Sequence, residues 1–482
     1  MADRVVERGL TPDAEAPGVE PAATHSGLSR GRLGVSRGAL TALAFAGAIS
    51  VTFLVQLPIL GHYFFGDDFI PLAEMVTNGK REYVKNLALL DDVTPNWRFL
   101  TGLYYLAMFE TFGVNARPFL AGSLLVHIGT VALLFWLVRR ALNAVWPAFF
   151  AAAFFGLAAA SVPTVGQVTA FNNVLAGFFV MLALVTLYEG LDRRRLLWWG
   201  PIAAGSFAAA IASNESAAML APVFPLMALW KITEAGGRFY GRDWLRLGAV
   251  TVAFGLIGGA ALIAFAACDC TQAGNSAVFG SGEHIIGNTW IFLGRLIYPI
   301  GFEVNPGEVE AAHLVAGLVL ALLLVMLLAR GPGLGRVAVV FLFLALLPQL
   351  PLQWALAPRY LYVPSIAFAI LAAVLAVELA RILTPRTRAA PLILALLASA
   401  ALGFQGWQTW DQNSSFDART EHWRELVNGL QERFPELPAG SKIYVLGGPL
   451  LDPTWQFSVL PAIGEILWGG IVIESLPVDW DT

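Results

Sequence analysis

Long apolar runs separated by short charged segments recur along most of the chain. The first run, residues 38–60, is uncharged over 23 residues, and about 20 apolar residues cross the hydrocarbon core of a bilayer. No small-residue cleavage site follows this run, so we expect an uncleaved anchor. The whole pattern predicts eleven transmembrane helices, near residues 38–60, 117–138, 146–163, 171–190, 196–213, 215–230, 247–267, 311–329, 336–353, 360–380 and 389–407.

Composition excludes several classes of protein. Apolar residues make up 57% of the chain and charged residues only 13%, whereas about 25% of a soluble domain is charged. A soluble core cannot hide so much apolar surface, because a larger core also enlarges the surface that water must wet. The net charge of −4 gives no basic field for nucleic acid. We therefore predict an all-α polytopic membrane protein with about eleven transmembrane helices.

Basic residues orient the predicted helices. With a cytoplasmic N-terminus, every inner loop is short and basic, and the inner segments hold 19 of the 30 Lys and Arg residues, as the positive-inside rule requires. An odd number of spans then places the C-terminus outside the cytoplasm. Arg outnumbers Lys by 26 to 4, which is typical of a GC-rich genome, so we expect a multi-pass protein of a bacterial plasma membrane.

Two stretches are too charged to count as spans. Residues 96–113 contain Arg98 and Glu110, and counting them would invert every later loop. We place this stretch, and residues 286–301 with Arg295, in helices at the outer interface. The predicted domains are a disordered cytoplasmic tail at 1–37, a transmembrane module at 38–407 with long outer loops at 61–116 and 268–310, and a small extracytoplasmic domain at 408–482.

The last domain differs in composition from the rest of the chain. Residues 411–434 are charged and helix-like, Lys442–Leu446 and Ile471–Ile473 have the pattern of short strands, and residues 447–449 are typical of a turn. We therefore expect an α/β appendage. Cys268 and Cys270 in the second outer loop form neither a zinc site nor a disulfide framework, which leaves incidental thiols or one strained or intermolecular disulfide.

An aspartate pair, Asp67–Asp68, follows the first span among aromatic residues. Desolvation and mutual repulsion would raise the pKa of one carboxyl, which suits a general base or a pair of ligands for a metal ion. A helix N-cap at the membrane surface is the alternative. A second pair, Asp91–Asp92, lies in a more polar context, and we interpret it as a cap.

Other polar residues interrupt apolar sequence at predicted outer turns. Glu215 is either a functional carboxylate or a residue of a solvent-exposed hairpin between two spans. Gln167 and Asn172 either bind sugar hydroxyls or end helices. Arg359 lies at the start of a late span, where its planar guanidinium would bind a phosphate or extend toward lipid headgroups. Tyr360 and Arg295 complete the candidate substrate-binding residues.

The predicted topology brings these residues together, although they are far apart in the sequence. Asp67, Asp68, Gln167, Glu215 and Arg359 all fall on the outer face. Carboxylates and an arginine gathered at the outer membrane surface suggest a binding site for a phosphate-bearing ligand that enters from the bilayer. By contrast, we expect His127, alone within a span, to hydrogen-bond a neighbouring helix.

With these residues in place, the chain resembles the GT-C superfamily of membrane glycosyltransferases, which use polyprenyl-phosphate-linked sugars. Its likeness is greatest to the protein O-mannosyltransferase and aminoarabinose-transferase branch. The features that carry it, over about residues 40–410, are the aspartate pair after the first span, Glu215 before another span, Tyr298-Pro299, and the run Arg359-Tyr360-Leu361-Tyr362-Val363-Pro364-Ser365. Relatives often carry Lys before the glutamate, where this chain has Asn214.

The resemblance implies a glycosyltransferase with an inverting mechanism. Asp67, or less favourably Asp68, would take a proton from the acceptor hydroxyl, and Arg359 would neutralise the departing polyprenyl phosphate. Members differ in metal use, so Mg²⁺ or Mn²⁺ between Asp67 and the phosphate is compatible with the pattern. The acceptor would be a protein, a glycan or a lipid. Two rivals remain at this stage, a transporter or flippase of a lipid-linked saccharide and a non-catalytic membrane assembly factor.

Overall fold

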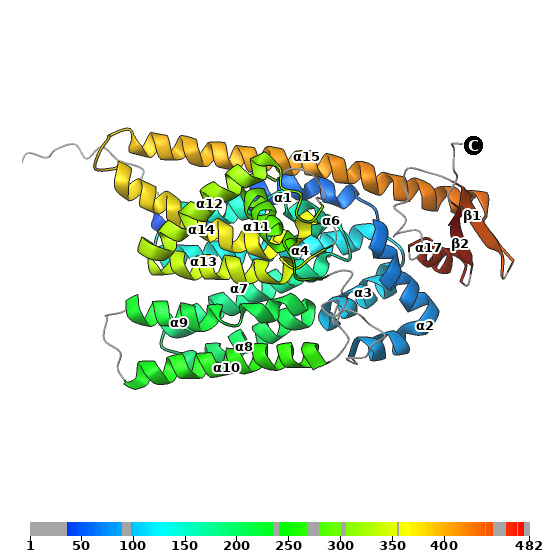
Figure 1. Cartoon of the computed structure of the whole chain (residues 1–482), viewed down its shortest axis with the longest axis horizontal. Coiled ribbons are helices and arrows are strands. Elements are labelled where there is room, and N and C mark those ends of the chain that lie inside the picture. Colours follow the sequence, from blue (N-terminus) through cyan, green and yellow to red (C-terminus); the bar gives the residue numbers. More distant parts are fainter. Residues whose placement is uncertain are drawn as a thin grey trace, which may run out of the picture.

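The computed structural model describes residues 36–88, 98–234, 241–267, 279–299, 305–353, 356–438, 440–446, 459–469 and 471–476. Most of its helices run along the long axis of the molecule (Figure 1). Within the described residues, nine helical segments are long and apolar enough to cross a membrane. They are built on α1 (Arg37–Gln56), α4 (Ala116–Leu142), α7 (Phe171–Asp192), α8 (Leu196–Ser213), α9 (Val223–Glu234) with the preceding 3-10 helix η3 (Glu215–Leu220), α10 (Gly241–Ala267), α12 (Ala311–Arg330), α14 (Tyr362–Leu383) with the preceding η6 (Pro358–Leu361), and α15 (Ala390–Arg433).

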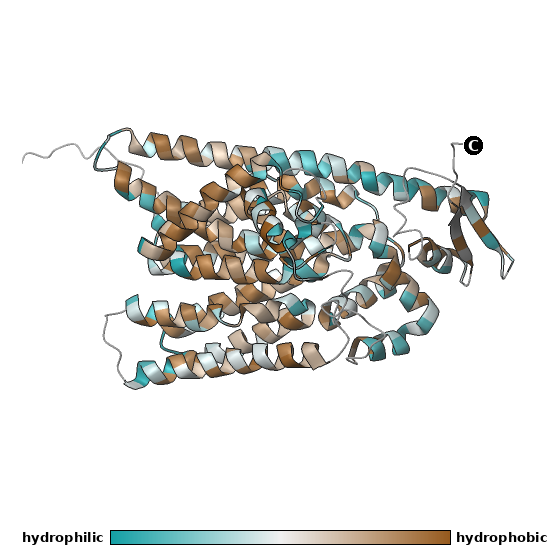
Figure 2. Cartoon of the chain, in the orientation of Figure 1, coloured by the Kyte–Doolittle hydropathy of each residue, from teal (hydrophilic) through white to brown (hydrophobic). Residues whose placement is uncertain are grey.

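Two further predicted spans form shorter apolar helices. These are α5 (Val145–Gly156) and α13 (Gly333–Leu346), of 12 and 14 residues, and η5 (Leu347–Gln349) extends the second. Each of the eleven predicted apolar runs therefore contains a helix. Brown, apolar ribbon dominates the bundle in Figure 2, and the prediction of an α-helical polytopic membrane protein is confirmed.

Helix α7 lies at the centre of the bundle, where it contacts α4, α8, α9 and α14. Small residues permit this close packing, since a Cβ added to Gly177 would lie 2.8 Å from the ring of Tyr362 on α14. The Tyr362 hydroxyl also hydrogen-bonds Nδ1 of His127 on α4 at 2.9 Å. The expected role of His127 as a helix–helix hydrogen-bonding residue is confirmed.

One end of the bundle carries the small helices and the C-terminal unit (Figure 1). Helices α2 (Phe69–Ala88) and α3 (Phe99–Phe112) lie there, and α2 bends at Gly79, whose φ is +74°. Among the described residues, neither α3 nor α11 (His284–Ile297) is long and apolar enough to count as a span, and each has 14 residues. Their placement at the interface stays a prediction. We call this the appendage end.

The C-terminal unit is built on a strand–helix–strand motif. Strands β1 (Lys442–Leu446) and β2 (Val472–Leu476) pair in parallel, and α17 (Val459–Trp468) connects them and packs on α2. The first strand matches its predicted range, and the second begins one residue later than predicted and extends to Leu476. Helix α15 runs 44 residues without a break through position 408, where the sequence suggests a domain boundary. The N-terminal tail to residue 35, Asp91–Asp92, both cysteines and the turn at 447–449 lie outside the described residues.

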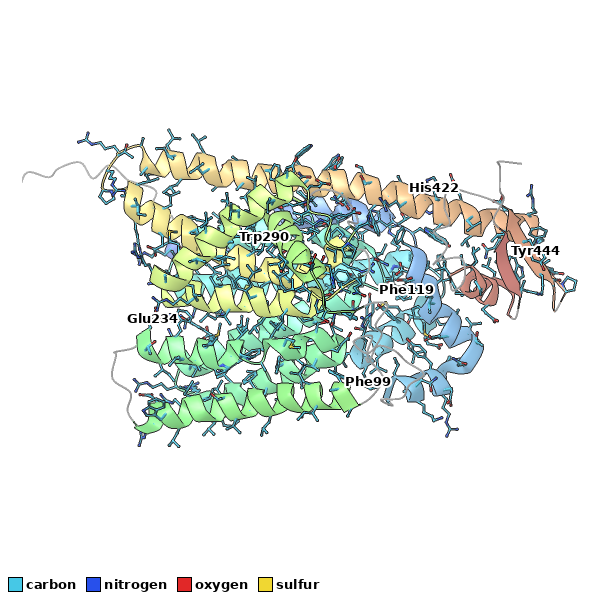
Figure 3. All side chains as sticks on the ribbon, viewed as in Figure 1. Phe99, Phe119, Glu234, Trp290, His422 and Tyr444 are labelled. Atoms are coloured by element: carbon cyan, nitrogen blue, oxygen red, sulfur yellow. The ribbon has the colours of Figure 1, made fainter. Side chains whose placement is uncertain are left out.

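The opposite end of the bundle carries a cluster of ion pairs, and we call it the ionic end. Figure 3 places Glu234 there and Tyr444 at the far end of the molecule. Glu189 of α7, only 3% exposed, pairs with Arg140 of α4 at 2.9 Å and with Arg193 at 2.6 Å. These charges hold the ends of α4 and α7 together.

Candidate active site

Asp68 anchors the first turn of the appendage end. Gly66 adopts φ +53° just before the pair, so the chain reverses sharply into the short 3-10 helix η2 (Gly66–Asp68). The Asp68 carboxylate is fully buried and accepts four hydrogen bonds, from the backbone amides of Phe65, Val168 and Thr169 and from the Thr169 hydroxyl, at 2.7–3.2 Å. Burial raises its pKa to about 6 against the opposing effect of these donors. Asp68 thus clamps residues 65–68 to the loop between α6 (Ser161–Gly166) and α7.

Asp67 differs from Asp68 both in burial and in hydrogen bonding. Its side chain is half-buried. Within the described parts of the chain, the Asp67 carboxylate has no hydrogen-bond or ion-pair partner. Because Asp68 fixes the turn, the free carboxylate of Asp67 is held on a rigid backbone, as a general base must be.

Arg359 joins the same loop from the other side. The guanidinium Nη1 donates to Oε1 of Gln167 at 3.0 Å, and the Gln167 amide donates to the Thr169 hydroxyl at 3.2 Å. That hydroxyl in turn donates to Asp68 at 2.8 Å. A continuous hydrogen-bonded chain therefore links Arg359 to the residue next to Asp67. We call residues 167–169 the hub.

Helix α3 holds the hub from a third direction. The Tyr105 hydroxyl donates to the carbonyl of Val168 at 2.8 Å. Arg98, at the start of the same helix, pairs with Glu215 at 3.5 Å, and both side chains are largely buried. Glu215 therefore has an ion-pair partner, although neither Arg98 Nε nor Glu215 Oε2 makes a hydrogen bond among the described residues, and α3 is linked to both the hub and η3.

His62 packs behind the hub. A Cβ added to Gly166 would lie 2.8 Å from its Nδ1, so only glycine fits there. The imidazole also lies against Phe416 of α15, with ring centroids 5.1 Å apart. Burial lowers the pKa of His62 to about 4, so the ring is neutral at physiological pH. It acts as packing between the hub and α15.

Three asparagines form a second polar group beside the hub. Asn172 accepts from the backbone and side-chain amides of Asn173 at 2.9 and 3.0 Å. Asn173 accepts from the side chain of Asn214 at 3.0 Å, and Asn214 accepts from the backbone amide of Ser216 at 3.0 Å. Asn172 thus orients Asn173 rather than ending the helix alone. The group ties the start of α7 to η3.

Arg295 lies apart from this network. It is 2% exposed on α11, and its guanidinium donates to the carbonyl of Leu356. It lines a narrow pocket of about 10 Å³ with Ser365 and Gln405, close to the space that one water molecule needs. Arg295 therefore supports the segment that leads into Arg359. Tyr360 packs under the Arg359 guanidinium, which lies 5.4 Å from the ring centroid.

The donor set for a metal ion is small. Among the described residues, no group of three His, Cys, Asp or Glu side chains is placed to hold one. Asp68 is fully occupied by its four hydrogen-bond donors, which leaves Asp67 as the carboxylate available at this turn. An Mg²⁺ or Mn²⁺ ion here would need phosphate oxygens from a ligand to complete its coordination.

Sequence reasoning missed Thr169 and Tyr105. Thr169 follows Gln167 by two residues, so its presence in the same polar turn was a usable signal. Tyr105 lies in an apolar helix and does not stand out in the sequence alone. Only the fold brings it to the site.

Comparisons with known proteins place the fold. No family model matches the sequence, and no curated protein is significantly similar to it. The archaeal oligosaccharyltransferase AglB from Archaeoglobus fulgidus, solved with an inhibitory peptide and a dolichol-phosphate, is similar at a TM-score of 0.52 and 12% identity. That match covers 90% of this chain but 64% of AglB, so the chain spans under two thirds of that protein.

Two bacterial structures are also similar, at lower TM-scores. ArnT from Cupriavidus metallidurans, bound to undecaprenyl phosphate, has a TM-score of 0.47 and 16% identity, with 88% of this chain and 85% of ArnT covered. The arabinofuranosyltransferase AftD from mycobacteria has a TM-score of 0.45 and 18% identity, with 90% and 32% covered. The match to AglB shows that the chain shares the fold of that membrane oligosaccharyltransferase, in agreement with the fold that the resemblance implied.

Proposed function

We propose that the chain is an inverting membrane glycosyltransferase that moves a sugar from a polyprenyl-phosphate donor to an acceptor hydroxyl at the appendage end. The observation that carries the proposal is the contrast within the aspartate pair. Asp68 is locked by four hydrogen bonds, Asp67 has no side-chain partner among the described residues, and the hub connects the pair to the cation of Arg359. The GT-C fold adds independent support.

The chemistry follows from these groups. Asp67 takes the proton of the acceptor hydroxyl as its oxygen attacks the anomeric carbon. The bond from that carbon to the phosphate oxygen breaks, and its electron pair leaves with the polyprenyl phosphate. Arg359 stabilises this charge, which grows toward the transition state, so its effect is on rate as well as on binding. A single displacement inverts the anomeric configuration.

The level of the site along the bundle suits a lipid-linked donor. Trp407 and Trp410 of α15 are 61% and 60% exposed, next to the charged Asp411. Exposed tryptophans typically lie at the membrane–water interface. Between them, Thr409 donates to the carbonyl of Leu157 near the hub-bearing loop. These positions support a hub near the membrane–water interface, where a polyprenyl phosphate would present its headgroup.

We further propose that the appendage end faces away from the cytoplasm. The ionic end then faces the cytoplasm and carries the Arg139–Arg140 and Arg193–Arg195 segments, as the positive-inside rule requires. The acceptor, whether protein, glycan or lipid, would approach from the side of α2, α3 and the C-terminal unit. Labelling a cysteine at position 194 and one near the C-terminus from outside the cell tests this orientation.

A divalent ion stays part of the proposal in a limited form. Asp67 would hold Mg²⁺ or Mn²⁺ only together with the donor phosphate, and the ion would add positive charge beside the leaving group. Transfer measured with EDTA, and again after adding each metal, decides whether this chain uses one.

Two features argue against the rival functions. Alternating access needs polar binding groups that serve both ends, whereas Glu189, Arg140 and Arg193 at the ionic end are engaged with one another. An assembly factor that only keeps the fold would have its carboxylates paired. Glu215 is paired, but Asp67 has no partner in the part of the chain that the structure describes.

The test is reconstitution of the purified protein in liposomes with polyprenyl-phosphate-linked sugars, with release of polyprenyl phosphate as the readout. Lipid that co-purifies in detergent, identified by mass spectrometry, selects the donor to use. We expect turnover that requires the lipid-phosphate sugar. Movement of intact donor across the bilayer without release of polyprenyl phosphate would support the flippase rival instead.

A further inference from the structure

The turn between α7 and α8, residues 193–195, carries three consecutive arginines at the ionic end, and we call it the arginine turn. Arg193 is engaged, because its Nε pairs with Glu189 at 2.6 Å. Arg194 and Arg195 are exposed, and within the described residues neither side chain has a hydrogen-bond or ion-pair partner. Two positive charges of this turn therefore lack an acidic partner in the described part of the chain.

The two acidic residues that precede the arginine turn are already paired with other cations. Asp192 pairs with Arg140 at 2.8 Å and with Lys231 at 3.0 Å. Glu189 pairs with Arg140 at 2.9 Å as well as with Arg193. Each carboxylate thus already contacts two cationic side chains. The remaining positive charge of the arginine turn can be matched by an anion from outside the chain.

The backbone of the turn holds Arg194 in a conformation that favours glycine. Its φ is +54°. The amide of Arg195 donates to the carbonyl of Gly190 at 2.8 Å, and the amide of Arg194 donates to the carbonyl of Leu191 at 3.3 Å. These bonds form a Schellman motif, in which the left-handed position is usually glycine. An arginine is strained there, so closing the helix is not what its side chain contributes.

The arginine turn directly precedes a membrane-spanning helix. Helix α8 begins at Leu196, and its 18 residues are about 27 Å long, close to the thickness of about 30 Å of the bilayer core. Leu197 and Trp198 are 91% and 78% exposed, the highest values among the described large apolar side chains. Exposed tryptophans typically lie at the membrane–water interface. We therefore expect Arg194 and Arg195 at the level of the lipid phosphates.

We propose that the arginine turn binds the phosphate of an anionic glycerophospholipid of the surrounding membrane. The planar guanidinium groups of Arg194 and Arg195 donate to the phosphate oxygens. Leu197 and Trp198 contact the first part of the acyl chains. The occupant is a lipid rather than a free anion, because the two charges adjoin exposed apolar side chains. The inference does not rest on the proposed function.

The experiment measures lipid binding to the purified full-length protein in detergent, by native mass spectrometry and by the shift in Tm. The probes are phosphatidylglycerol, which is anionic, and phosphatidylcholine, which has no net charge. One arginine near an anionic lipid surface strengthens binding about fivefold. For two arginines, we expect the wild type to bind phosphatidylglycerol about 5-fold to 25-fold more tightly than phosphatidylcholine.

Variants locate this preference in the arginine turn. Arg194→Gln and Arg195→Gln should each lower the preference for phosphatidylglycerol about fivefold. Arg388→Gln is the matched control, since Arg388 is also exposed and its side chain has no partner within the described residues. Arg388 follows α14 at the same end of the bundle (Figure 1). The control should keep the wild-type preference.

Arg194→Gly separates lipid binding from the structure of the turn. Glycine adopts a φ of +54° without strain. The Tm of this variant in lipid-free detergent should therefore equal or exceed that of the wild type, while its preference for phosphatidylglycerol falls about fivefold. A lower Tm together with an unchanged preference would show that Arg194 only closes the turn, and would overturn the proposal.

Three further results would also overturn it. Equal binding of phosphatidylglycerol and phosphatidylcholine would exclude recognition of the anionic lipid. Equal losses in Arg194→Gln and Arg388→Gln would show a positive field spread over the whole ionic end rather than a site at one turn. Displacement of phosphatidylglycerol by millimolar inorganic phosphate would show a site for a free anion. Sugar transfer is not measured, so these outcomes are independent of the proposed function.

Discussion

The guanidinium of Arg359 donates a hydrogen bond to the side-chain oxygen of Gln167 at 3.0 Å, across 192 residues of sequence. This contact orients the cation that the proposed reaction needs. Gln167 is 2% exposed and is itself held by Thr169, so the orientation is set before any ligand arrives. Such preorganisation lets a charged group stabilise a transition state without rearranging at the moment of reaction.

Removal of either partner should therefore slow transfer to different extents. We expect Arg359→Ala to lower kcat/KM by about 100-fold to 1,000-fold, because the departing phosphate loses its cation. Arg359→Lys keeps the charge without the planar fork and should recover part of this loss. Gln167→Ala should lower kcat/KM about tenfold, since the guanidinium of Arg359 remains but is no longer held in its orientation. Steady-state kinetics measure all three, and equal activity of Arg359→Ala and wild type would remove Arg359 from the site.

Asp68 and Asp67 should respond differently to the same substitution. Asp68→Asn places an amide group among four donors, so at least one hydrogen bond becomes a donor–donor clash. We expect a loss of about 1–3 kcal/mol of stability, seen as a lower Tm in detergent. Asp67→Asn should leave Tm unchanged. The reverse order of Tm values would contradict the division of roles within the pair.

The pKa of Asp68, raised by burial to about 6, predicts a dependence on pH. As the pH falls through about 6, the folded protein binds this proton, whereas the unfolded chain binds it only near the ordinary value of 3.8. Proton uptake between these values favours the folded state, so this group should not lower Tm as acid is added.

The protonated carboxyl keeps one oxygen as a full acceptor, and its single O–H can turn away from the amides, which the two N–H groups of an asparagine amide cannot both do. One bond to the hub is nevertheless weakened. We expect an acid limb near pH 6 in the transfer rate, while Tm holds or rises over the same range. Difference infrared spectra should show a protonated carboxyl band that appears near pH 6 and is missing in Asp68→Asn. Tm falling in step with the rate would show that acid unfolds the protein instead.

The ionic end should matter for stability and not for transfer. Glu189→Gln leaves Arg140 and Arg193 without their shared buried partner. Both arginines are partly exposed, so we expect a modest loss of about 1–3 kcal/mol, with KM and kcat unchanged at a temperature where the variant is folded. A large rise in KM for the donor would indicate a binding site at this end and would favour the transporter rival.

The sequence predicted the transmembrane helices well because their signal is local. Each span is a continuous apolar run, and the positions of Asp67, Gln167 and Arg359 followed from counting spans. The sequence could not show which polar side chains contact one another. Asp68 accepts a hydrogen bond from Thr169, which is 101 residues away in the sequence, and Glu215 is paired with Arg98. Such pairings depend on how the helices pack, which no local pattern in the sequence reveals.

Long helices also hide domain boundaries from sequence. The change in composition near residue 408 marks where α15 changes from an apolar to a charged surface, and Figure 2 shows this change along one unbroken helix. The residue composition of α15 depends on the solvent that surrounds each part of the helix, whereas its backbone hydrogen bonds continue through the change in composition. A boundary in composition is therefore not a boundary in structure here.

The central claim is that Asp67 is the base of a sugar transfer, and a single-turnover measurement tests it most directly. Wild type, Asp67→Asn and the control Asp411→Asn are each loaded with saturating polyprenyl-phosphate-linked sugar and mixed with acceptor. We expect transfer by wild type and by the control, and none by Asp67→Asn, although that variant binds the donor with wild-type affinity. Wild-type rates from Asp67→Asn would contradict the account.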